Sequence, residues 1–280
     1  DVMRSLLDQQ ANVNAVDTNN TTVLHEASMY GHHQCIELLL DRHANVNAVD
    51  TINNAPLHWA SRNGHLRCIE LLLDRQASIN TVDTINSTPL HEASMNGHLQ
   101  CIELLLDRQA NVNTVDTSNG TPLAAASFNG HLTCVELLLD RQANVNTGTN
   151  HNTTPLHDAS INGQLQCVEL LLDRQANINA VDTSNGTPLA AASLCGHLTC
   201  VELLLDRQAN VNAGTNDSFT PLFAASYNGN HQCVELLLDR HADVNVATIR
   251  RKNTSLHAAS CEGHQRCIEL LMDRGASKSF

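Results

Sequence analysis

A period of 33 residues constrains this 280-residue chain more than any other feature. Cysteines recur at that spacing from Cys35 to Cys233, and Cys267 follows after 34 residues. The segment Leu-Leu-Leu-Asp-Arg keeps the same register. Such self-similarity indicates a repeat protein, in which each unit buries its apolar face only by stacking on its neighbours. The sequence therefore predicts one continuous array.

Eight full units and one partial unit account for the whole chain. We expect a partial N-terminal repeat or cap at 1–16, and the extra residue of the last repeat lies within Val246–Asn253. The last helix keeps the apolar pattern of the internal ones, so we expect more chain, or a partner, beyond Phe280. The eight predicted repeats are 17–49, 50–82, 83–115, 116–148, 149–181, 182–214, 215–247 and 248–280.

The sequence of each unit predicts two short helices and a turn. In the third repeat Thr88 is a natural N-cap, Pro89 takes the first helical position, and Gly97 ends the helix. A second helix is predicted over Leu99–Arg108, with apolar residues spaced to cover one face. The segment after it turns outward. Asn-Gly at 119–120 and 185–186 predicts type I′ turns, because both positions tolerate positive φ.

Thr-Pro-Leu-His at 88–91, Ala-Ser-Met-Asn-Gly-His at 93–98 and Leu-Leu-Leu-Asp-Arg-Gln-Ala-Asn-Val-Asn at 104–113 resemble the ankyrin repeat. The resemblance covers essentially the whole chain. It implies antiparallel helix pairs with projecting fingers, stacked into a curved solenoid. The expected fold class is therefore all-α with short β-hairpin fingers, an ankyrin-type helix-turn-helix solenoid of about eight repeats of 33 residues.

The chain departs from the family pattern after the second helix. The family usually has glycine there, as at Gly275, whereas the other repeats carry histidine or glutamine. A left-handed conformation at these residues costs about 1 kcal/mol each relative to glycine. The residues are His43, Gln76, Gln109, Gln142, Gln175, Gln208 and His241.

The motifs disfavour an enzyme or a metalloprotein. The pair His98 and Cys101 has ligand-like spacing and recurs, but zinc needs about four ligands that converge, and the repeats spread these pairs apart. The family resemblance instead gives the first-helix histidines, such as His91, a role in hydrogen bonding the backbone. Catalysis needs one convergent set of groups, which a periodic array does not favour. We predict no catalytic residue, no metal and no cofactor.

Charge and cysteine usage limit the partners and the compartment. Sixteen Lys and Arg against 29 Asp and Glu argue against nucleic acid, and no apolar run is long enough to span a membrane. Cysteines of adjacent repeats are expected about 8–10 Å apart, too far for a disulfide. They are predicted core residues. Free thiols favour the cytoplasm or the nucleus, and a monomer is the default expectation.

Comparison of the repeats with one another predicts the binding surface. The position two before the Gly-His turn is mostly apolar here, and the resemblance implies that it faces the concave groove. Exposed apolar patches mark interaction sites, and aromatic residues anchor them. The alternative is that these side chains fold back between repeats and extend the core. The predicted partner-binding residues are Met29, Trp59, Arg62, Met95, Phe128, Ile161, Leu194 and Tyr227, with Ile52, Ile85 and Phe219 at the finger tips.

The predicted function is a non-catalytic protein–protein interaction scaffold that binds a partner protein or peptide through its concave helix face and fingers. The alternative is a targeting or substrate-recognition segment of a larger adaptor, effector or enzyme. Glu26, Glu92 and Asp158 would add negative charge to the groove, which predicts a partner with apolar anchors and basic residues. The basic run 250–252 is interpreted either as a solvated loop or as a contact for an acidic peptide or phosphate.

Overall fold

The computed structural model describes residues 12–184, 186–214 and 219–276, which divide into two compact units. The first unit comprises Asp1–Ala126 and Thr133–Asn144, and the second comprises Ser127–Leu132 and Val145–Phe280. The predicted cap at 1–16 lies mostly outside the described residues. The repeat boundaries remain a prediction, although each predicted full repeat contains one pair of short helices.

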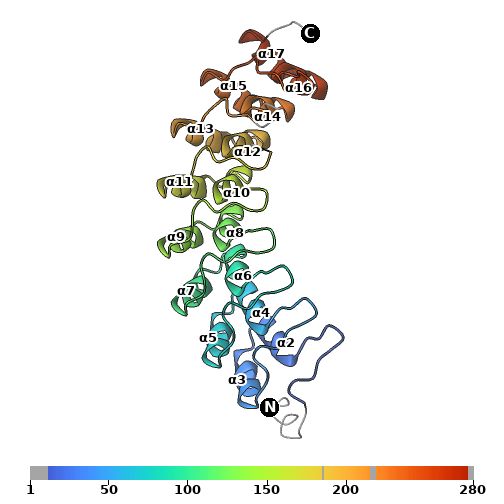
Figure 1. The fold of residues 1–280 in the computed structure, drawn as a ribbon, viewed down its shortest axis with the longest axis vertical. Helices are drawn as coiled ribbons and strands as arrows, with labels where there is room; N and C mark the ends of the chain where they lie inside the picture. The colour runs from blue at the N-terminus through green and yellow to red at the C-terminus, as the bar shows by residue number, and fades with distance from the viewer. Residues whose placement is uncertain (1–11, 185, 215–218, 277–280) are drawn as a thin grey trace. The chain divides into compact units, whose positions relative to one another are not determined.

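The first unit stacks its helix pairs in two rows (Figure 1). The even-numbered helices pack on one another, and so do the odd-numbered ones. The loops between repeats project on the side of the even-numbered helices. The pairs are α2 (Val23–Met29) with α3 (His33–Asp41), α4 (Pro56–Arg62) with α5 (Leu66–Asp74), and α6 (Pro89–Met95) with α7 (Leu99–Asp107).

Helices α8 (Pro122–Phe128) and α9 (Leu132–Asp140) each contain residues of both units. The second unit repeats the two-row arrangement. Its pairs are α10 (Pro155–Ile161) with α11 (Leu165–Asp173), α12 (Pro188–Cys195) with α13 (Leu198–Asp206), α14 (Pro221–Tyr227) with α15 (His231–Asp239), and α16 (Ser255–Glu262) with α17 (Gln265–Asp273). In each unit we call the side formed by the even-numbered helices and the loop tips the finger face.

The 33-residue cysteine register is a core position. In α7, Cys101, Ile102 and Leu105 are buried together, and the first helix contributes Ala93. All ten cysteines lie among the described residues, and none of them is in a disulfide. Burial raises the pKa of the Cys101 thiol to about 11, so the thiol stays neutral and packs as a small apolar group. The predicted core role is confirmed.

The backbone after the second helix is left-handed where the sequence predicted it. Residues Gln76, Gln109 and Gln142 have φ between 67° and 70°, and the corresponding Gly275 has φ of 85°. The prediction of type I′ turns is wrong at Asn119-Gly120, because only Asn119 has positive φ. The cause is Asp116, whose Oδ1 accepts the Ser118 and Gly120 N–H groups at 2.7 and 2.8 Å. Asn185 of the other Asn-Gly pair lies outside the described residues.

The fingers are hairpin-shaped loops. Asp116 N donates to Gly120 O at 3.0 Å, and Asn119 N donates to Asp116 O at 2.9 Å, which closes a three-residue loop ending in a left-handed residue. Among the described residues the strand pairing amounts to one isolated bridge, Val16 with Thr22. The predicted fold class, an all-α ankyrin-type solenoid with hairpin fingers, is confirmed.

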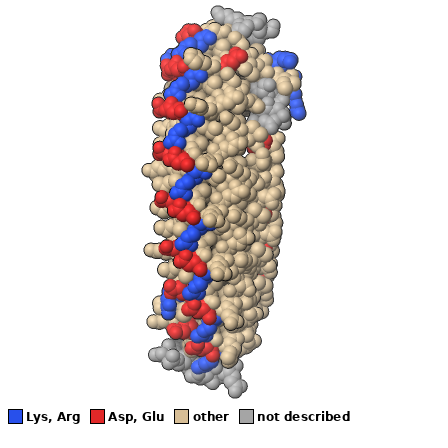
Figure 2. All heavy atoms as spheres, turned by 60° about the vertical axis from the view of Figure 1, so that its left-hand side comes forward, with Lys and Arg blue, Asp and Glu red and all other residues tan. Residues whose placement is uncertain are grey.

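Charged residues gather along the odd-numbered helices of each unit (Figure 2). In several repeats the Arg of the Leu-Leu-Leu-Asp-Arg segment pairs with the Asp of the preceding segment, as in Arg75–Asp41 at 2.7 Å and Arg207–Asp173 at 2.7 Å. These pairs are exposed, and each contributes at most about 1 kcal/mol. The recurrent Asp-Arg pairs therefore link neighbouring repeats on the side away from the finger face.

Candidate functional site

The structure exposes most of the predicted binding residues. In the first unit Ile52, Ile85 and Met95 are exposed. In the second unit Phe128, Ile161, Leu194, Phe219 and Tyr227 are exposed. Exposure excludes the alternative that these eight side chains extend the core. Their role in binding remains a prediction.

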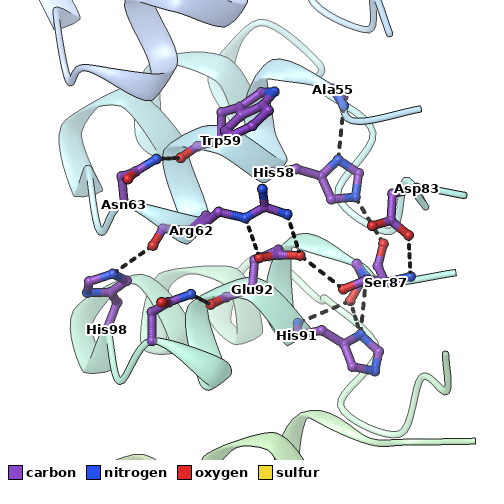
Figure 3. Close-up of polar contacts among 12 residues, drawn as sticks. Ala55, His58, Trp59, Arg62, Asn63, Asp83, Ser87, His91, Glu92 and His98 are labelled. Atoms are coloured by element: carbon purple, nitrogen blue, oxygen red, sulfur yellow. Dashed lines mark hydrogen bonds and ion pairs between the residues drawn. The ribbon is translucent and has the colours of Figure 1, made fainter. Parts of the chain in front are cut away.

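The other three predicted residues, Met29, Trp59 and Arg62, are half-buried. The side chains of Trp59 and Arg62 make contacts within the first unit (Figure 3). The Arg62 guanidinium on α4 donates to both Glu92 oxygens on α6, Nε to Oε2 at 2.7 Å and Nη2 to Oε1 at 3.0 Å. The same guanidinium carbon lies 4.7 Å from the centre of the Trp59 ring, a cation–π contact. The Trp59 Nε1 donates to Asp50 Oδ2 at 3.2 Å. Arg62 therefore links α4 to α6, and Trp59 packs against its guanidinium.

This network corrects the prediction that Glu92 offers negative charge to a partner. Glu92 is only 4% exposed, its carboxylate accepts two bonds from Arg62, and Ser87 Oγ donates a third at 3.3 Å. The hydrogen bond to Glu92 raises the pKa of Arg62, so the guanidinium stays charged. Glu26, at the same repeat position, is exposed.

In four repeats a histidine ties the repeat to the next one through the backbone. His91 Nδ1 accepts the Thr88 N–H at 3.1 Å, which leaves Nε2 to carry the proton and donate to Gly120 O at 3.1 Å. His25, His58 and His157 repeat this arrangement. Burial lowers the pKa of all four rings. The backbone role that the resemblance implied for these histidines is observed.

The histidines of the His-x-x-Cys pairs also contact the backbone of a neighbouring repeat. His98 Nε2 lies 3.0 Å from the Arg62 carbonyl oxygen, and His197 Nε2 lies 3.0 Å from that of Ile161. Asn230 replaces this histidine in one repeat, and its amide also donates to backbone carbonyl groups, of Ser193 and Leu194. The ring lies flat against a glycine: a Cβ at Gly64 would come within 2.5 Å of His98 Nδ1. Within the described part of the chain, no group of three His, Cys, Asp or Glu residues is arranged to hold a metal.

A pocket of about 570 Å³ opens on the finger face of the second unit. The predicted residues Ile161, Leu194 and Tyr227, from α10, α12 and α14, all line it. Phe219 and Phe223 form a second aromatic side, with ring centroids 4.5 Å apart at 74°. Four of the predicted binding residues therefore meet at one site.

Small residues create the pocket. Ala190 occupies the position of the backbone-bonding histidine, and Ala191 and Ala224 occupy the position that holds Trp59 in the second repeat. These three alanines leave the space that larger side chains fill elsewhere. These alanines are not among the predicted binding residues, because they come together only when the repeats stack. Asp182 and Arg250 of the fingers complete the lining.

Asp158 on α10 lies one helical turn before the pocket residue Ile161, at the repeat position of Glu92. Residues three apart on a helix are neighbours, with Cβ atoms about 5–6 Å apart. Among the described residues, the Asp158 carboxyl group has no hydrogen bond or ion pair, and desolvation raises its pKa to about 7. Arg62, the ion-pair partner of Glu92, is replaced by Phe128 at the equivalent repeat position before Asp158. Two acids at the same repeat position therefore have opposite environments.

The comparisons with known proteins agree with this architecture. A family model described as ankyrin repeats (3 copies) matches residues 1–83, 76–149, 142–215 and 210–280. The chain belongs to the ankyrin repeat family. It is similar to the crystal structure of the human ASB11 ankyrin repeat domain, with 30% sequence identity and a TM-score of 0.72 over 81% of this chain and 100% of that one. No curated protein matches the chain.

Ankyrin repeats are generally protein–protein interaction modules, and their fold is typically a non-catalytic binding scaffold. Among the described helices, none is both long and apolar enough to cross a membrane.

Proposed function

We propose that this chain is a non-catalytic scaffold that holds a partner protein or peptide on the finger face of its second unit. The observation that carries the proposal is the pocket on α10, α12 and α14, which gathers four predicted binding residues around an alanine floor. A preformed apolar pocket with aromatic walls is the kind of site that anchors an interface.

The rigidity of the unit supports the proposal. Two of the three pocket helices, α12 and α14, begin with a threonine cap: Thr187 Oγ1 accepts the Ala190 N–H at 3.2 Å, and Thr220 Oγ1 accepts the Phe223 N–H at 3.2 Å. A surface held in this way loses little conformational entropy when a partner binds. Binding is therefore expected to leave the backbone of the unit nearly unchanged.

The test uses a phage-displayed library of random 16-residue peptides selected against the full chain. Ala191→Trp fills the pocket with the residue that the second repeat naturally carries at this position. Thr199→Trp adds the same side chain to an exposed site on α13 and serves as the matched control. Far-UV circular dichroism and melting first establish that both variants are folded.

We expect the selected peptides to bind Ala191→Trp at least about tenfold more weakly than the parent chain, and to bind Thr199→Trp with unchanged affinity. Peptides that bind all three chains equally well would refute the proposed site.

We also propose a reducing compartment, the cytoplasm or the nucleus, and a monomeric state. The ten free thiols support the compartment. The cysteines Cys195 and Cys261 are exposed. If the chain is suited to a reducing compartment, its transfer into an oxidising buffer should produce disulfide-linked dimers through these two thiols. Sedimentation of the reduced chain as a dimer would contradict the monomeric state.

A further inference from the structure

The acids Glu92, which is buried, and Asp158, which is half-buried, share one repeat position and differ in a way that points to the chemistry of the partner. Glu92 in the first unit receives a guanidinium from Arg62, which donates two hydrogen bonds at 2.7 and 3.0 Å. Asp158 in the second unit stands at the same position, and no described residue supplies it with a cation. Burying a carboxylate without a partner is costly, and a cation that meets it recovers this cost.

The side chain at the Arg62 position explains why the cation is missing. Phe128 lies 30 residues before Asp158, as Arg62 lies 30 residues before Glu92. Phe128 is 49% exposed and offers an aromatic ring rather than a donor. In the first unit the guanidinium of Arg62 also lies against an aromatic ring, that of Trp59. An arginine at Asp158 would thus find a carboxylate with which to pair.

The position of the pocket determines how far the arginine lies from the apolar anchor in the partner segment. Asp158 and the pocket residue Ile161 share one face of α10, one turn apart. A segment seated in the pocket therefore places a neighbouring residue within reach of the carboxylate. An extended strand or one helical turn spans this separation.

We propose that the second unit recognises a partner segment by two features: a bulky apolar side chain seated in the α10–α14 pocket, and an arginine close to it in the segment that pairs with Asp158. This inference rests on the proposed function. It adds a requirement for charge, which we call the charge rule: the site binds apolar segments that carry a guanidinium more tightly than apolar segments that do not.

The raised pKa of Asp158 supports this reading, because it reflects desolvation with no compensating charge. The acid is therefore available to a new partner, whereas Glu92 is already satisfied by Arg62.

The experiment uses the peptides selected as described above, with affinities measured by fluorescence anisotropy at pH 8. Each peptide is compared with its Arg→Gln form on the parent chain and on Asp158→Asn, which completes a double-mutant cycle. Glu202→Gln, an exposed acid on α13, is the matched control for the change in net charge. A purely structural role of Asp158 would not produce coupling in this cycle.

We expect pocket-dependent peptides to share an arginine at a fixed distance from a bulky apolar residue. Asp158→Asn should weaken their binding about tenfold to a hundredfold, and Arg→Gln should cost nothing further on that variant. Glu202→Gln should leave the affinity unchanged. Peptides that bind through the pocket without a basic preference, or that bind Asp158→Asn as tightly as the parent, would overturn the charge rule and leave the proposed function standing. A selection that gives no pocket-dependent peptide would overturn both.

Discussion

Replacing Asp158 with asparagine is expected to stabilise the folded chain above about pH 4, with the gain growing up to about pH 7 and complete above it. The carboxyl group has its pKa raised from 3.8 to about 7 because burial disfavours the ionised form. The folded state therefore holds this proton between about pH 4 and pH 7, whereas the unfolded state releases it. Stability contributed by the protonated acid is present below pH 4 and is lost as pH rises toward 7.

The size of the effect follows from the shift. Each pKa unit corresponds to about 1.4 kcal/mol, which sets an upper limit of about 4 kcal/mol. Asp158 is half-buried rather than fully enclosed, so solvent screening reduces the expected gain to about 2–3 kcal/mol at pH 8. Asparagine is neutral at every pH, so the gain should vanish near pH 4. His157 is present in both proteins, so its titration largely cancels in the comparison.

Urea unfolding followed by far-UV circular dichroism at pH 4.5, 6 and 8 measures this difference. The chain also supplies a comparison of opposite sign. Glu92→Gln removes the partner of Arg62, whose side chain is one-third exposed, and is expected to destabilise the chain by about 1–3 kcal/mol at pH 8. If Asp158→Asn shows the same stability difference from the parent at all three pH values, the reasoning about an uncompensated carboxylate fails.

Three further predictions concern the repeat framework. Gln109→Gly should raise the stability by about 0.5–1 kcal/mol in urea titrations, since φ is 70° there; a loss of stability would show that the glutamine side chain matters more than the backbone. His58→Ala should lower the stability by about 2–4 kcal/mol, because the Ala55 N–H and the Ser87 carbonyl group lose their partner; a loss below 1 kcal/mol would show that water replaces the ring. Iodoacetamide should modify Cys195 and Cys261 well before the buried cysteines, as peptide mass spectrometry would reveal; uniform labelling would contradict the packed core.

The fold followed from the sequence because its signals repeat. Thr88 and Pro89 specify a helix start, and Gly97 specifies its end; the structure places α6 at Pro89–Met95. The turn at Asn119 was mispredicted because the Asn-Gly pair was considered without Asp116, whose carboxylate accepts the backbone N–H groups and sets the loop. A local motif was thus overridden by a side chain three residues earlier.

The candidate site was harder to predict than the fold, because it depends on pairs of residues in different repeats. The repeat register places Phe128 and Tyr227 at one repeat position, but it does not fix their exposure, because Arg62 at the same position is half-buried. The different environments of Glu92 and Asp158 depend on what stands 30 residues earlier, Arg62 in one case and Phe128 in the other. The pocket likewise required three-dimensional placement of Ala190, Ala191 and Ala224.

The most direct test of the account is to locate a selected peptide on the chain by methyl NMR. Methyl-labelled protein would be titrated with one pocket-dependent peptide, and shifts would be followed at Ile161, Leu194 and Ala191. The account predicts the largest changes at these three methyl groups and none at the outer residue Leu203 of α13. Largest changes along α11 and α13, with the pocket methyl groups unmoved, would contradict the claim that the finger face of the second unit binds the partner.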